Sequence, residues 1–235
     1  MLRDNSARSK KAIKFLSIMI GIGVIGSLLL FLKMADASSF IELSEKSSFE
    51  RIWDVIVFVL WILNSVFVIQ WFRRAYFNLH TLRPEGRRYS EGMAAGCWWI
   101  PIANWFIPYQ IMSDLWEGSR EVLPSAELEK LQFDQKYKLV SLWWGLYVGS
   151  SLAGIVLGVY VGVRAAQGNV DIDLTMFMII SVISSIINVI AGVLFIQIIK
   201  GYSELEAVLA IGSSGQFSDF GVPEKSGNWE KDETI

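Results

Sequence analysis

Four long stretches without a charged side chain constrain this sequence more than any other feature. They cover residues 15–32, 55–72, 139–163 and 174–199, and each has at least 18 residues. A helix needs about 20 predominantly apolar residues to cross roughly 30 Å of hydrocarbon. Because the stretches lack the alternating pattern of barrel strands, only helices can satisfy their backbone groups in lipid. The sequence therefore predicts an all-α, polytopic transmembrane helical bundle.

Composition supports a membrane protein and gives no sign of catalysis. Hydrophobic residues make up 53% of the 235 residues, mean hydropathy is +0.42, and the charged residues gather between the four stretches. The single cysteine, Cys97, and the single histidine, His80, exclude a disulfide within the chain and a multi-thiolate or paired-histidine metal site. Phosphate-loop, nucleophile-elbow and zinc-protease motifs are absent from the sequence. We predict a non-enzymatic protein without cofactor or metal, and rank a membrane-embedded enzyme last of three function classes.

The chain is predicted to form one helical membrane domain over residues 1–211. The last helix should continue past residue 199, because apolar residues keep a helical period up to Ala210. Residues 212–235 are rich in Gly, Ser and acidic residues and are predicted to be disordered.

The first stretch precedes an Ala-Asp-Ala sequence that resembles a signal-peptidase site. Because its apolar core exceeds the usual length of about 7–15 residues, we interpret it as a membrane anchor, with cleavage as the alternative.

Residues 96–112, GCWWIPIANWFIPYQIM, are apolar enough for lipid but contain two prolines. Proline breaks the helical hydrogen-bond ladder, so this segment is either a kinked fifth span or a hairpin. In a hairpin, residues 93–101 would form one arm and the chain would turn near residues 101–104. A hairpin places 17 of the 21 Lys and Arg residues on one side of the membrane, whereas a crossing places 11 and 10 on the two sides. The positive-inside rule therefore favours four full spans plus a proline-broken re-entrant or interfacial hairpin, with both termini cytoplasmic; five spans are the alternative.

The third stretch repeats small residues at every fourth position, a spacing that lets two helices approach closely in lipid. Packing within the chain is the favoured interpretation, and a homo-oligomer contact is the alternative. The predicted helix-packing residues are Gly145, Gly149, Gly154, Gly158 and Gly162.

A few polar side chains occur inside the stretches. Ser184 and Asn188 lie on one helix face, and Asn64 lies in the second stretch. Such groups usually bond across a contact between helices. They would instead line the pathway of a small channel or transporter, which is the alternative function. Because no Asp, Glu, Lys, Arg or His occurs within the four stretches, a proton-coupled pump or a voltage sensor is not expected.

Five arginines lie between residues 73 and 88, directly after the second stretch. Basic residues at a membrane boundary attract anionic headgroups, at about 1 kcal/mol each. They also act as a positive-inside signal, which requires no binding site. The patch is short and close to the bilayer, so no nucleic-acid partner is expected.

An ordered set of rare residues follows the same helix end. It reads WxxRAxxN at 71–78, WWIPIAN at 98–104, PYQ at 108–110 and LWxxS at 115–119. This pattern resembles the bacterial membrane-protein family catalogued as domain of unknown function 4328, with the motif region at about residues 60–120. The family commonly has a basic residue where this chain has Ile107 and Glu117, which leaves fewer cations for headgroup binding here. The resemblance implies a multi-pass protein of the bacterial inner membrane and brings no known activity.

The motif residues also suggest a site. We predict that Arg74, Asn78 and Asn104 converge near the inner interface around an anionic headgroup or a partner's carboxylate. The alternative is that they only satisfy the broken backbone. The favoured function is binding of a lipid or a partner membrane protein through the basic helix end and the Pro/Trp-rich segment. The candidate binding residues are Arg73, Arg74, Asn78, Asn104, Tyr109 and Trp116.

Overall fold

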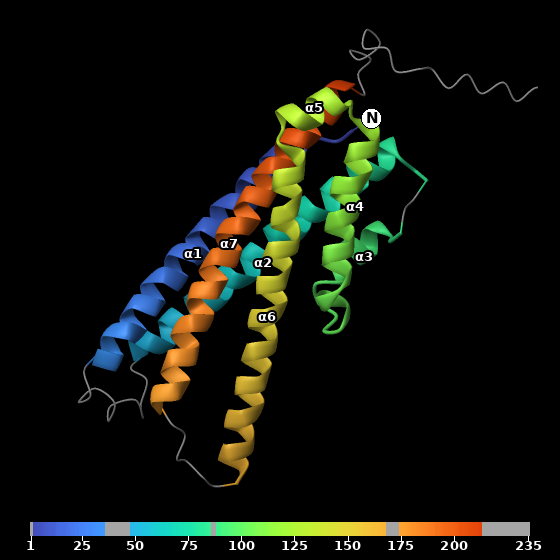
Figure 1. Ribbon diagram of the computed structural model, residues 1–235. Helices are drawn as coiled ribbons and strands as arrows, with labels where there is room; N and C mark the ends of the chain where they lie inside the picture. The colour runs from blue at the N-terminus through green and yellow to red at the C-terminus, as the bar shows by residue number, and fades with distance from the viewer. Residues whose placement is uncertain (1, 36–47, 86–87, 168–173, 213–235) are drawn as a thin grey trace, which may run out of the picture.

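A computed structural model describes residues 2–35, 48–85, 88–167 and 174–212, and within them the chain is helical without strands (Figure 1). The four long helices are α1 (Ser6–Ala35), α2 (Ser48–Leu82), α6 (Phe133–Ala166) and α7 (Leu174–Ile211). All four are long and apolar enough to cross a membrane. The predicted all-α bundle with four membrane-crossing helices is therefore confirmed, and the architecture is that of a multi-pass membrane protein. The predicted disordered tail lies outside the described residues, apart from Gly212.

Local sequence explains where the long helices begin and end. At the start of α1, the Asp4 carboxylate accepts a hydrogen bond of 2.9 Å from the Ser6 N–H, and hydrogen bonds from Ser6 lower the pKa of that carboxyl. α2 ends two residues before Pro84, which disfavours a helical residue before it. α7 runs to Ile211, which confirms the predicted extension beyond residue 199.

Between α2 and α6 the chain forms a helical hairpin followed by a short surface helix. The hairpin consists of α3 (Glu91–Gly96), the 3-10 turn η2 (Ala103–Trp105) and α4 (Ile107–Val122). The surface helix is α5 (Ser125–Lys130). α3 is shorter than the arm expected over residues 93–101, because Pro101 cannot continue a helix and the residue before a proline disfavours helical geometry. Pro108 lies in the first turn of α4, where its missing N–H costs no hydrogen bond.

The long helices form a row, in which α1 packs against α2 and α7, and α7 packs against α6. One end of this row holds the N-terminus, the last turns of α2 and α7, α5 and the first turns of α6 (Figure 1). We call it the packed end. The hairpin starts and finishes there, and α4 lies against α2, α6 and α7.

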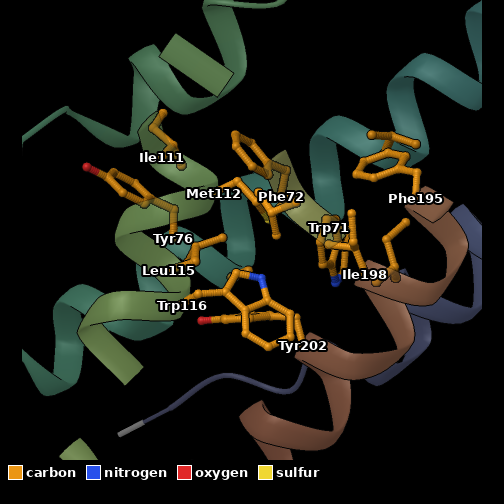
Figure 2. Close-up of a cluster of buried hydrophobic side chains, with 14 of the residues drawn as sticks. Trp71, Phe72, Tyr76, Ile111, Met112, Leu115, Trp116, Phe195, Ile198 and Tyr202 are labelled. Atoms are coloured by element: carbon orange, nitrogen blue, oxygen red, sulfur yellow. The ribbon is translucent and has the colours of Figure 1, made fainter. Parts of the chain in front are cut away.

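Buried side chains concentrate at the packed end (Figure 2). Trp71 and Phe72 of α2 meet Trp116 of α4 and Tyr202 of α7 in one aromatic cluster. Away from this end the long helices expose their apolar side chains, and at most 11% of each apolar window is buried. Such a surface is unfavourable in water and suits hydrocarbon. The folded core therefore lies at one end of the bundle, and the lipid-compatible surface forms the rest.

Small residues allow a close approach between α1 and α7, whereas the repeated glycines of α6 do not bring that helix close to another one. A Cβ added to Gly192 would lie 2.9 Å from Ile20, and one added to Gly23 would lie 3.6 Å from Val189. The Ser27 and Ser185 hydroxyls hydrogen-bond across the same contact. At Gly145, Gly149, Gly154, Gly158 and Gly162 an added Cβ would meet nothing within 4 Å among the described residues. The favoured packing within the chain is therefore not found at these five glycines among the described residues, and an oligomer contact through them stays a prediction.

Candidate functional site: an arginine recess at the packed end

Four arginines from two distant parts of the chain surround one recess of about 140 Å³. Arg73 and Arg74 come from α2, directly after its apolar stretch, whereas Arg3 and Arg8 come from the N-terminal segment and the start of α1. Gln70, Phe77 and Glu91 complete the lining of what we call the arginine recess. It therefore lies where α1, α2 and the start of α3 meet.

The recess carries an excess of positive charge. Arg73 and Glu91 form its one ion pair within the described residues, with 3.7 Å between the nitrogen and oxygen atoms. No carboxylate in the described part of the chain lies within ion-pair distance of Arg3, Arg8 or Arg74. Like charges held together repel, so this cluster gains stability from any anion that enters it.

Phe77 positions two of the guanidinium groups. The Arg3 Cζ lies 4.2 Å from the centre of the Phe77 ring, and the Arg74 Cζ lies 5.9 Å from it. A cation over an aromatic face is attracted by the ring without using its N–H groups. The ring therefore holds both arginines while leaving their hydrogen-bond donors available.

Residues 2–5 form an N-terminal segment, which we call the strap, that positions Arg3 in the recess. The Arg3 N–H donates to Asn78 Oδ1 at 3.0 Å, and Asn78 Nδ2 donates to the Arg3 carbonyl at 2.7 Å. Asn78 Nδ2 also donates to the Glu206 carboxylate, which accepts a second bond of 3.1 Å from Asn5 Nδ2. Asn5, Asn78 and Glu206 are buried, so this network fixes the strap between α2 and α7.

The predicted binding residues separate into different environments. Arg73 and Arg74 line the recess, and Asn78 lies behind it as the anchor of the strap. The structure does not bring Asn104 there, because the hairpin carries it away from the packed end to Tyr147 of α6, with 3.0 Å between Asn104 Nδ2 and the Tyr147 hydroxyl. The expected convergence of Arg74, Asn78 and Asn104 is therefore not found.

Two aromatic candidates pack against other helices instead of facing the recess. Tyr109 lies over Trp144 with 6.1 Å between ring centres, and its hydroxyl lies 3.2 Å from that of Ser141. Trp116 is fully buried in the core, between Phe133 and Tyr202. Both rings therefore hold the hairpin against α6 and α7.

Sequence reasoning missed Arg3, Arg8, Phe77 and Glu91. The two N-terminal arginines were visible as cations before the first stretch, where the positive-inside rule already explained them. Contacts between residues 66 and 75 positions apart carry no local signal, so only the fold reveals this cluster.

Of the polar residues proposed to line a channel, Asn188 has partners on its own helix and on α6, whereas the buried Asn64 Oδ1 has no hydrogen-bond partner among the described residues. Asn188 Nδ2 donates to the Ser184 carbonyl at 2.8 Å, and its Oδ1 accepts from Ser150 of α6 at 3.4 Å. Asn64 lies on α2 rather than on α6 or α7. Asn188 thus serves the contact between α6 and α7, as the favoured interpretation expected, and the Ser184 carbonyl accepts its bond within α7.

The residues of the WxxRAxxN, WWIPIAN, PYQ and LWxxS segments mostly dock the hairpin. Trp98 meets Phe72 edge-on at 5.5 Å, and Gln110 accepts a hydrogen bond from the Tyr89 hydroxyl. A family model described as Domain of unknown function (DUF4328) matches residues 36–204. The chain belongs to the DUF4328 family. No curated protein and no solved structure matches it. The DUF4328 match contains α2, the hairpin and α6, and it begins after the strap and α1, which supply Arg3 and Arg8.

Proposed function

We propose that this protein is a non-enzymatic membrane protein that binds an anionic lipid headgroup in the arginine recess. The observation that carries the proposal is the convergence of four arginines on one recess with a single carboxylate. Arg73 directly follows the apolar residues 55–72, so the recess opens at the level where phosphates of a bilayer would lie. A partner membrane protein that presents a carboxylate is the alternative ligand from the same chemistry.

We further propose that the hairpin dips into the same leaflet. Asn104 bonds to Tyr147, which lies eight residues inside the apolar stretch of α6, or about 12 Å along the helix. Large apolar side chains are exposed at the hairpin turn, with Ile102 74% and Phe106 57% exposed. Hydrocarbon is the favourable environment for such a turn. The proposal includes a bacterial plasma membrane and cytoplasmic termini, because the positive-inside rule puts the arginine-rich end inside.

Cysteine labelling tests the topology. We expect cysteines at Glu85 and at Ser125 to be equally protected from an impermeant maleimide in sealed spheroplasts, because the hairpin returns to its starting side. A cysteine at Gln167, at the opposite end of α6, should label at once. Native Cys97 should stay silent until denaturation, since the thiol is buried and burial raises its pKa to about 12. Opposite labelling of positions 85 and 125 would mean that the hairpin crosses the membrane.

Lipid titration tests the recess. Arg74→Gln should weaken binding of dioctanoyl phosphatidylglycerol about tenfold, because a charge-assisted hydrogen bond contributes about 1.5–3 kcal/mol. Native mass spectrometry of the purified full chain in mild detergent gives the bound fraction at each lipid concentration.

Lys138→Gln is the matched control for this variant. It removes one positive charge from an exposed residue of α6 at the same boundary but outside the recess. We expect a change smaller than twofold. Equal losses in the two variants would indicate nonspecific attraction to the basic end and would contradict a site in the recess.

A further inference from the structure

We infer that the arginine recess selects a phosphomonoester headgroup over a phosphodiester headgroup. This inference rests on the proposed function, since it names the class of anion that the same site takes. A phosphomonoester ends in three free oxygens, whereas a phosphodiester within a lipid offers two. Charge and donor geometry favour the monoester, and the recess has room for its phosphoryl group.

Charge provides the first argument. The recess gathers four guanidinium groups and one carboxylate, and that carboxylate contacts only Arg73. Arg3, Arg8 and Arg74 have no carboxylate within ion-pair distance among the described residues. A phosphomonoester carries about −1.5 to −2 charges near pH 7, and a diester carries one. The monoester therefore relieves more of the repulsion between the arginines.

Donor geometry provides the second argument. Arg3 and Arg74 are held by the Phe77 face, so their N–H edges are not used in positioning them. Each guanidinium has five donors in a planar fork that suits pairs of phosphate oxygens. A monoester offers these donors a third terminal oxygen as an acceptor. In a diester the corresponding oxygen is part of the second ester bond.

The size of the recess is compatible with this group. At about 140 Å³ it has room for a phosphoryl group. A terminal phosphate can come from a lipid such as phosphatidic acid or from a free phosphate ion, and both sources share this chemistry.

The same chemistry gives a pH signature. The second pKa of a phosphomonoester is about 6, so its second charge is present above that pH and is lost as pH falls. A diester has no such step. Glu91 is the one ionisable group of the lining besides the arginines. Asp4 belongs to the strap and Glu206 lies behind it, where two amides hold the Glu206 carboxylate; neither lines the recess. Protonation of any of these carboxyls would strengthen the binding of both lipids as pH falls. The loss of the second phosphate charge instead weakens the binding of the monoester alone.

Calorimetric titration of the full chain in uncharged detergent micelles tests the inference. The probes are dioctanoyl phosphatidic acid, dioctanoyl phosphatidylglycerol and inorganic phosphate, each at pH 7.5 and pH 5.5. We expect phosphatidic acid to bind at least tenfold more tightly than phosphatidylglycerol at pH 7.5. That ratio should fall at least threefold at pH 5.5, in the native chain and in Glu91→Gln. Arg74→Gln should remove most of the preference.

The outcomes separate the inference from the proposed function. Equal affinities for the two lipids that both depend on Arg74 would overturn the monoester preference and leave headgroup binding in place. Lipid affinities that ignore Arg74→Gln would overturn both. If inorganic phosphate competes at the same concentration as phosphatidic acid and depends on Arg74, monoester recognition is supported, and the ligand is a free anion rather than a lipid.

Discussion

Replacing Trp116 with alanine should lower the free energy of unfolding by about 3–5 kcal/mol, the largest effect we expect from a single truncation. The indole is fully buried, with its ring centre 5.3 Å from that of Phe133 and 6.1 Å from that of Tyr202. It also lies against Gly201 of α7, where an added Cβ would be 3.4 Å away. Trp116 lies beside Tyr202 in the cluster (Figure 2), and removing the indole leaves a cavity where α4, α6 and α7 meet.

Trp99→Ala is the matched control, because that indole is 57% exposed at the hairpin turn. An SDS titration in mixed micelles, followed by circular dichroism, gives the unfolding free energy of each variant. We expect Trp99→Ala to change it by less than about 0.5 kcal/mol, as surface substitutions usually do. Similar values for the two tryptophans would contradict a core at the packed end.

The two tryptophans also show why the long helices could be predicted from the sequence, whereas the roles of single aromatic residues could not. Four uncharged stretches require helices because backbone groups must be satisfied in lipid. A tryptophan near a membrane boundary, however, suits the interface and the protein core equally well. Trp116 was assigned to lipid or partner binding and lies in the core, because α4 packs against three helices that the sequence could not place around it.

Two of the four arginines of the recess, Arg73 and Arg74, were candidate binding residues in the sequence. They follow an apolar stretch, and Arg74 belongs to the WxxRAxxN motif. Arg3 and Arg8 were not candidates, because the strap reaches α2 through contacts between residues that are 75 positions apart. Asn78 was correctly placed on the same helix face as Arg74, but its role differs from the predicted one. Its amide hydrogen-bonds to the strap rather than to a ligand. Long-range polar pairs of this kind have no periodicity that a sequence can display.

Replacing Asn78 with leucine should be the second large effect, lowering the free energy of unfolding by about 2–4 kcal/mol. The substitution keeps the approximate volume of the side chain but removes two bonds to the Arg3 backbone and one to the Glu206 carboxylate. A buried polar group left without a partner costs about 1–3 kcal/mol, and a charged one costs more. Affinity for phosphatidylglycerol should also fall about tenfold, although Asn78 does not line the recess, because the strap would no longer hold Arg3 in place.

The double variant Asn78→Leu with Glu206→Met separates the two effects. Replacing both partners of the buried amide–carboxylate bond by apolar groups can be nearly neutral, so the part of the loss that comes from the unpaired Glu206 carboxylate should return. The two bonds to the Arg3 backbone stay lost, so the strap is held by Asn5 Nδ2 on the Trp71 carbonyl and Arg3 by the Phe77 ring, and headgroup affinity should remain low. SDS titration and native mass spectrometry measure the two quantities on the same preparation. If affinity recovers together with stability, the strap does not position Arg3, and the recess would then depend on Arg8, Arg73 and Arg74.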